Sequence, residues 1–483
     1  MISYGFLFSL PLLLTVYYRI PGNRRWWFLL AASAGFYLHS GARYLGFLLF
    51  TAVSVYMTAG RCRGRKGLLC GCLTANFLLL AVCKIGLTVP LRGLDFLSLG
   101  LPLGMSFYLF GAAGYLLDVY RGRQEPERNF GKFFLFLTWF PQLIQGPVTR
   151  FSQVSRSLFS PAPFDARQVS FGIQRMAWGY FKKLVLADRM ALAVLALRDP
   201  RYLGAGFFTL TLFYGIQIYC DFTGGMDMVL GLSQAFGVTL PENFRRPFFS
   251  KNTAEYWRRW HMTLGAWMKD YVFYPLSVSA PMRKFARFSR KQWGAFGRRL
   301  PIYLASLVTW IVTGLWHGIT PNFLLWGLLN WLVITVSQEL TPLFRRFHDR
   351  FGWKEKPWYG GFEILRMTVL MDLIRACDLF PRVGEYFSRL GSLVTAPSLW
   401  FFTDGSLLTL GLSGLDYTIL LVGCLMLLGV SVYQEKRGSV RERLWALPVP
   451  VQYMLFLGLV LAILLLGRYG VGYDAAAFIY NQF

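Results

Sequence analysis

Apolar runs of membrane-spanning length recur along the whole chain of 483 residues. They fall at 3–19, 26–39, 44–59, 67–89, 100–118, 131–147, 170–197, 205–222, 225–236, 300–317, 322–338, 362–380, 415–433 and 449–467. A bilayer core about 30 Å thick is crossed by ~20 residues of α-helix. Several runs are shorter than this, so we expect about 10–12 true spans, the others being re-entrant or interfacial helices. The pattern predicts an all-α, polytopic membrane protein.

The composition excludes several other classes of protein. Of the residues, 55% are hydrophobic and 15% are charged, against a usual charged share of about 25%. Too few polar residues remain to coat several water-facing domains, and a disordered chain would be poor in apolar residues. The seven cysteines lie mostly in apolar runs and are interpreted as core residues. No repeat or linker divides the sequence, so we expect one transmembrane domain over residues 1–483.

The net charge of +26 is carried by short basic clusters between the apolar runs. These clusters occupy 61–66, 121–132, 245–299 and 436–443. Lysine and arginine concentrate in cytoplasmic loops of membrane proteins, which places the clusters on the cytoplasmic side. The loops near 90–100 and 393–414 are almost free of basic residues and should face outside. Nucleic acid is excluded as a partner because the apolar runs are too long for a nucleic-acid-binding domain.

Trp316-His317-Gly318 places a histidine at the end of a long apolar run. A charged side chain at mid-bilayer costs about 2.5–3.5 kcal/mol, so polar groups there need a partner, a cavity or a function. Pro321 disfavours helix in the residue before it, so the helix should stop or kink here. A neutral, buried His317 could accept a proton from a hydroxyl group. The alternative is a histidine hydrogen-bonded to a neighbouring helix.

A second polar segment runs from Trp257 to His261 and includes Arg258, Arg259 and Trp260. Arginines mixed with tryptophans are typical of an interfacial helix; the alternative is the polar floor of a cavity that holds a charged donor. The two histidines lie far apart in sequence and neither has an i,i+4 ligand partner, so no metal site is expected.

The third polar segment is 217–227, which holds Tyr219, Asp221 and Asp227 around the pair Gly224-Gly225. Two carboxylates and a glycine pair inside an apolar run predict a broken helix that lines a cavity. The alternative is a set of structural hydrogen bonds to nearby arginines. The sequence has no Gly-x-Ser-x-Gly elbow, phosphate loop or dinucleotide fingerprint, and therefore gives no support for an acyl-enzyme on serine.

Taken in order, these segments resemble the membrane-bound O-acyltransferase superfamily. The resemblance is closest to its bacterial polysaccharide branch, which includes the membrane subunit of alginate O-acetyltransferase and the D-alanyl transfer protein of teichoic acid modification. It rests on 104–108, 118–121, FPQLIQGP at 140–147, 178–183, 219–227, 240–244, YWRRWH at 256–261 and GLWHG at 314–318. The sequence differs from alginate-type members in two places. One is the stretch after Pro275-Leu276, and the other is 371–374.

The resemblance implies a central tunnel in which His317 is the catalytic residue and His261 a second active-site residue. It also makes eight further residues candidates for lining the tunnel or binding the donor: Trp316, Trp260, Arg258, Arg259, Asn243, Asp221, Tyr219 and Gln145. No bound cofactor is expected. The acyl donor would be acetyl-CoA or the thioester of an acyl carrier protein.

The resemblance further implies O-acylation, with acetyl favoured, of a cell-envelope or extracellular polysaccharide. The expected location is the bacterial cell membrane, and an exported acetyltransferase or hydrolase-like protein would be a partner. D-alanyl transfer towards teichoic acid is the alternative within the family. A membrane transporter or a non-catalytic scaffold are alternatives of another class; a transporter would need no acyl donor, and a scaffold would tolerate substitution of both histidines.

Overall fold

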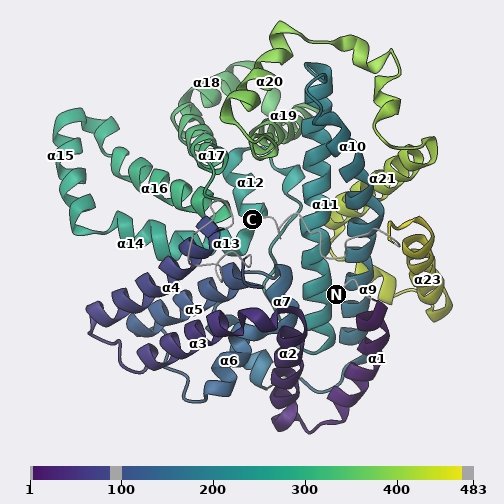
Figure 1. Ribbon diagram of the computed structural model, residues 1–483. Coiled ribbons are helices and arrows are strands. Elements are labelled where there is room, and N and C mark those ends of the chain that lie inside the picture. Colours follow the sequence, from purple (N-terminus) through teal and green to yellow (C-terminus); the bar gives the residue numbers. More distant parts are fainter. Residues whose placement is uncertain (1–3, 87–100, 161, 470–483) are drawn as a thin grey trace.

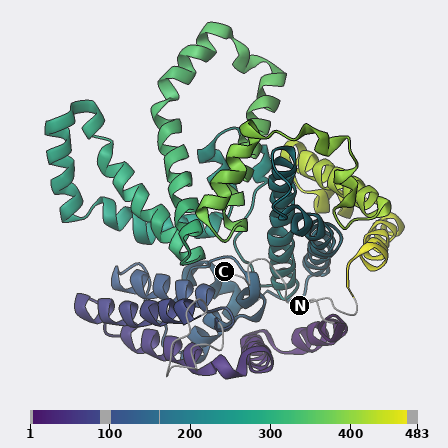
Figure 2. The ribbon, with the colours of Figure 1, turned by 45° about the horizontal axis from the view of Figure 1, so that its top comes forward.

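The computed structural model describes residues 4–86, 101–160 and 162–469, and every regular element in these ranges is a helix, which confirms the all-α prediction (Figure 1). The N-terminal helices pack together on one side of the molecule (Figure 2). This group comprises α1 (Tyr4–Arg19), α2 (Arg25–Gly41), α3 (Leu45–Ala59), α4 (Lys66–Gly86), α5 (Met105–Tyr120), α6 (Phe130–Thr138), α7 (Phe140–Gln145) and α8 (Phe151–Phe159). Trp139 separates α6 from α7, so run 131–147 is two short helices.

The centre of the molecule is built from α9 (Ala166–Tyr180), a π-helical segment (Phe181–Ala187), α10 (Asp188–Leu197) and the 31-residue α11 (Ala205–Ala235). The predicted break at Gly224-Gly225 is wrong, because α11 is continuous there. A Cβ atom at Gly224 would lie 2.9 Å from the backbone O of Gly179, and one at Gly179 would lie 2.6 Å from the backbone O of Gly224. These glycines therefore allow two helices to approach closely instead of interrupting one.

The next group of helices forms an arm that leaves the body and returns to its centre (Figure 1). It consists of α12 (Thr253–Arg259), α13 (Met262–Met268), a π-helical segment (Lys269–Phe273), α14 (Tyr274–Ser277), α15 (Ala280–Gly297) and α16 (Leu300–His317). Next comes α17 (Pro321–Glu339), so the helix stop predicted near Pro321 is confirmed. The remaining helices are α18 (Thr341–Phe351), α19 (Pro357–Arg375), α20 (Val383–Thr395), α21 (Gly414–Arg437), α22 (Val440–Trp445) and α23 (Val449–Leu466).

Within the described residues, five helical segments are long and apolar enough to cross a bilayer, or six if α17 and α18 form one bent span. The larger number of spans expected from the sequence stays a prediction. The outward faces of these helices are strongly apolar; on α21, Leu421, Val422 and Leu425 are exposed. Such a surface is suited to lipid and not to water. The protein is therefore a multi-pass membrane protein.

Candidate active site

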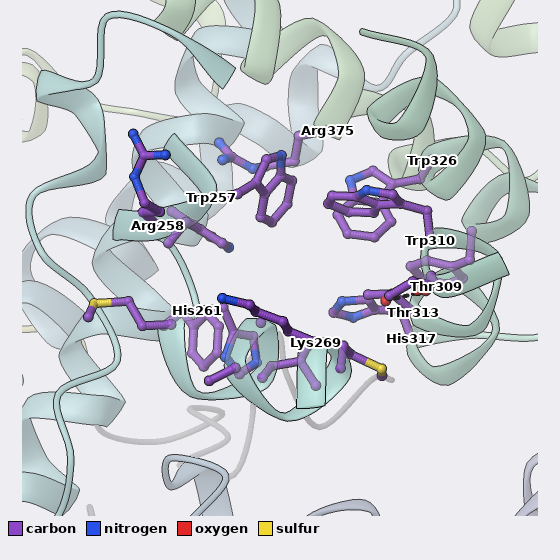
Figure 3. A pocket seen from close by; sticks show the side chains of 18 of the residues that line it. Trp257, Arg258, His261, Lys269, Thr309, Trp310, Thr313, His317, Trp326 and Arg375 are labelled. Atoms are coloured by element: carbon purple, nitrogen blue, oxygen red, sulfur yellow. Dashed lines mark hydrogen bonds between the residues drawn. The ribbon is translucent and has the colours of Figure 1, made fainter. Parts of the chain in front are cut away.

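A cavity of about 490 Å³ opens where α11, α12, α13, α16 and α17 meet. Its walls carry both histidines of interest, and Figure 3 shows His261 and His317 facing this common space from different segments of the chain. Most of the remaining lining is aromatic, including Trp257, Trp310 and Trp326. The sequence segments predicted to carry chemistry are thus brought together, although they are far apart along the chain.

His317 is the last residue of α16, and a tight hairpin with α17 sets its surroundings. A Cβ atom at Gly314 would collide with the backbone of Phe323, and one at Gly327 would lie 2.5 Å from the backbone O of Trp310. The glycines therefore permit the two helices to touch. As a result the ring of Trp326 lies 5.0 Å from the ring of His317, measured between centroids.

His261 lies between α12 and α13 and has a left-handed backbone conformation, with φ of 46°. Its Nδ1 is 3.2 Å from Oδ1 of Asn243. The same oxygen accepts hydrogen bonds from the backbone N and the hydroxyl of Thr263, at 3.1 and 2.7 Å. Asn243 thus holds both the imidazole and the first turn of α13. Burial lowers the pKa of His261 because desolvation disfavours the charged ring, which favours the neutral imidazole.

The indole of Trp316 packs against both histidines. Its ring centroid is 6.2 Å from that of His261 and 4.7 Å from that of His317. On another side it stacks on Phe110 of α5 at 5.4 Å. Trp316 is not among the residues that line the cavity, and it contacts both imidazoles from outside that lining.

The ten predicted site residues separate into three groups. Those that line the cavity are Asp221, Arg258, Trp260, His261 and His317. Those that support its histidines from behind are Asn243 and Trp316. Those that lie elsewhere are Tyr219, Arg259 and Gln145.

The third group has other surroundings. Tyr219 lines a separate cavity of about 250 Å³ and packs against Phe248. Arg259 forms ion pairs with Glu255 at 2.7 Å and Glu435 at 3.0 Å. Gln145 is buried, and its amide has no hydrogen-bond partner within residues 4–86, 101–160 and 162–469.

Several polar cavity residues were not predicted from the sequence. They include Arg375 and Asp378, which line the wall at the end of α19. Lys269 belongs to the continuation of the 257–261 segment, for which a polar cavity floor was the alternative prediction, and it faces the space from below (Figure 3). The guanidinium of Arg375 lies 4.6 Å from the ring of Trp260 and donates a hydrogen bond of 2.6 Å to Asp372. Arg375 and Asp378 are charged residues inside the apolar run 362–380. A charge within the membrane is costly, as for Asp221, and this cost was a signal that could have revealed both residues.

The carboxylates of segment 217–227 are held by basic side chains. Oδ1 of Asp221 is 2.5 Å from Nζ of Lys183, which also lies 2.8 Å from Asp188. Asp227 pairs with Arg175 at 2.8 Å and with Lys182 at 2.7 Å. For Asp227 the predicted alternative, a structural bond to an arginine, is therefore confirmed.

Comparison of the sequence with known protein families identifies the family of the chain. The model of the membrane-bound O-acyltransferase family matches residues 124–289 and 291–372. The chain belongs to the membrane-bound O-acyltransferase family. The matched ranges include both histidines of the cavity and stop before Arg375 and Asp378.

Curated relatives come from three groups of this family. The chain is 33% identical over 359 residues to "Probable alginate O-acetylase AlgI" of Azotobacter vinelandii, covering 68% of this chain and 66% of the relative. It is 28% identical to "Peptidoglycan O-acetyltransferase" of Helicobacter pylori, over 78% and 80% of the two chains. It is 25% identical to "Teichoic acid D-alanyltransferase" of Bacillus subtilis, over 63% and 77%. The chain spans just under two thirds of the length of the Azotobacter relative. It spans 47% of the length of the relative of the same name from Pseudomonas syringae.

No group of three or more His, Cys, Asp or Glu side chains within the described ranges is arranged to hold a metal ion. The lining of the cavity includes imidazole, indole and charged side chains.

Proposed function

We propose that this protein transfers an acyl group, with acetyl favoured, from a cytoplasmic thioester to a hydroxyl acceptor, for O-acylation of a bacterial cell-envelope or extracellular polysaccharide. The observation that carries the proposal is that His317 and His261 line one cavity. The membrane character of the chain and the names of the relatives support it.

His317 is the proposed general base. Its neutral imidazole takes the proton of the acceptor hydroxyl as the oxygen attacks the thioester carbonyl. The C–S bond then breaks, and the proton passes from His317 to the departing sulfur. A positioned general base contributes about 10²–10⁴-fold to such a reaction, and alignment of two substrates in one cavity can contribute more.

His261 is proposed to orient the substrates. Asn243 holds the imidazole through Nδ1, so the ring has a defined orientation beside the cavity. Its neutral state suits hydrogen bonding with the reacting groups in preference to ion pairing. Trp316 keeps the His261 ring in register with that of His317.

The donor is proposed to approach from the cytoplasmic side along the 245–299 region. On α15 five exposed cations project from the helix: Arg283, Lys284, Arg287, Arg290 and Lys291. Arg258 and Lys269 continue the positive charge into the cavity lining. Such a field attracts either the phosphates of acetyl-CoA or an acidic carrier protein. The acceptor hydroxyl would belong to an exported partner protein or to a lipid-linked sugar.

D-alanyl transfer towards teichoic acid is the second candidate. The relative of that name from Bacillus subtilis is 25% identical to the chain, against 33% for the alginate-type relative. We therefore place acetyl first.

The test is mass spectrometry of envelope polymers from a strain that lacks the gene, complemented with wild-type, His317→Ala or His39→Ala protein. His39 is an exposed histidine near the end of α2 and serves as the matched control. We expect O-acyl groups to disappear in the deletion strain, to return with wild type and His39→Ala, and to stay about 10²–10⁴-fold lower with His317→Ala.

Three results would count against this proposal. Unchanged polymers in the deletion strain reject the function. Full restoration by His317→Ala rejects the base assignment and favours a scaffold. Movement of a solute by the purified protein in liposomes without any acyl donor favours a transporter.

A further inference from the structure

Lys84 is a buried cation inside a helix of membrane-spanning length. It lies near the end of α4, whose 21 residues form one of the candidate spans, and only 6% of it is exposed. The other charged residue of α4, Lys66, lies at the exposed start of the helix. A lysine at such a depth is costly and calls for a specific partner.

The partner of Lys84 is the end of α16. Its Nζ donates a hydrogen bond to the backbone O of Trp316 and lies 3.5 Å from the backbone O of His317. The last carbonyls of a helix have no partner within that helix, and the helix dipole makes this end negative. The ammonium group therefore satisfies and neutralises the end of the helix that carries His317.

Side-chain packing joins the same two helices. Nζ of Lys84 lies 6.0 Å from the ring centroid of Trp316. About two turns before Lys84 in α4, Phe77 packs on Phe110 of α5, with ring centroids 6.2 Å apart. Phe110 in turn stacks on Trp316 of α16. After His317 the chain leaves the helix at once, because Gly318 is fully extended, with φ of −170° and ψ of 154°. The contact from α4 thus falls at the point where α16 ends abruptly.

We propose that Lys84 is a positioning residue for acyl transfer. It does not line the cavity, so it acts through the backbone of Trp316 and His317. By capping α16 it fixes the last turn, and with it the direction in which the His317 imidazole faces the cavity. The inference rests on the proposed function, since it assigns Lys84 to the base of that reaction.

The test compares Lys84→Met with Lys66→Met in the purified full-length protein reconstituted in lipid. Both changes remove one ammonium from α4, and only the first removes the contact with α16. For Lys84→Met we expect kcat to fall about 10–100-fold, because a small misplacement of a catalytic group costs rate, while KM for the thioester donor changes less than about twofold. For Lys66→Met both constants should match wild type.

Conservative variants separate positioning from general stability. Lys84→Arg keeps the charge and the donors and should recover at least part of kcat, whereas Lys84→Gln keeps a neutral donor and should recover less. If Lys84→Met does not insert, the comparison of Lys84→Gln with Lys84→Arg replaces it. Equal kcat for Lys84→Met, Lys66→Met and wild type overturns the inference, and so does a loss that appears in KM alone.

His317→Ala is measured beside these variants. An active His317→Ala overturns the proposed function itself. An inactive His317→Ala together with a fully active Lys84→Met overturns only the role of Lys84.

Discussion

The cavity between α12–α13 and α16–α17 can be compared with the contact between α9, its π-helical continuation and α11. Both regions bury polar side chains in helices of a membrane protein. In the first, His261, His317 and Arg375 border a space of about 490 Å³. In the second, Lys182 and Asp227 contact each other at 2.7 Å.

The two regions differ in what surrounds the glycines that bring their helices together. Where α9 meets α11, a Cβ atom at Gly172 would lie 2.5 Å from the backbone O of Gly231, and Gly179 faces Gly224 in the same way. The backbones of the two helices are therefore in contact at these glycines. Around His317 the glycines bring α16 and α17 together, and the large indoles of Trp310 and Trp326 keep the neighbouring space open. Both regions thus bury polar residues, but in the first of them the polar residues border a cavity.

The largest expected effect on stability comes from breaking the paired region. Asp227→Asn leaves Lys182 and Arg175 without their shared carboxylate, and loss of one partner of a buried ion pair costs about 3–5 kcal/mol. We expect a clearly lower thermal midpoint, measured by fluorescence-detected unfolding in detergent. The kcat of the protein that remains folded should be unchanged. A stable but inactive Asp227→Asn would erase the distinction between the two regions.

A smaller effect is expected from filling the helix contact. Gly179→Ala places a methyl group against the backbone of α11, and overpacking costs about 1–3 kcal/mol. Gly71→Ala in α4 meets nothing within 4 Å and should be neutral or stabilising by up to ~1 kcal/mol. The measurement is the same thermal midpoint for both variants. Equal midpoints would mean that α9 and α11 can separate without cost.

The smallest change in stability is expected for substitutions of two adjacent arginines, one at the cavity and one in an ion pair. Arg258 lines the cavity, whereas Arg259 pairs with Glu435 and Glu255. Arg258→Gln and Arg259→Gln should each alter stability by about 1 kcal/mol or less, because both side chains are partly exposed. Only Arg258→Gln should raise KM for the thioester donor, by about 3–10-fold. Steady-state kinetics checks this, and the same rise in both variants would contradict the assignment.

Much of the site could be predicted from local sequence. His317 was found because a histidine at the end of an apolar run is costly and Pro321 stops the helix behind it. His261 stood out through its setting of arginines and tryptophans. Lys84, Arg375 and Asp378 were missed, although the cost of an intramembrane charge applies to each of them. Their meaning depends on the contact with Trp316 or with the cavity wall, which connects distant segments.

The sequence alone determined that the chain is helical and embedded in a membrane, because runs of apolar side chains decide both properties locally. It also determined the residue types available for chemistry and the point where α16 stops. The tertiary structure decided which polar residues share a space. It made Gly224 a packing contact instead of a break, turned Tyr219 towards a second cavity and left Arg259 outside the first. Each outcome depends on which face of a helix meets its neighbour, and that choice is made by close packing between segments far apart in the chain.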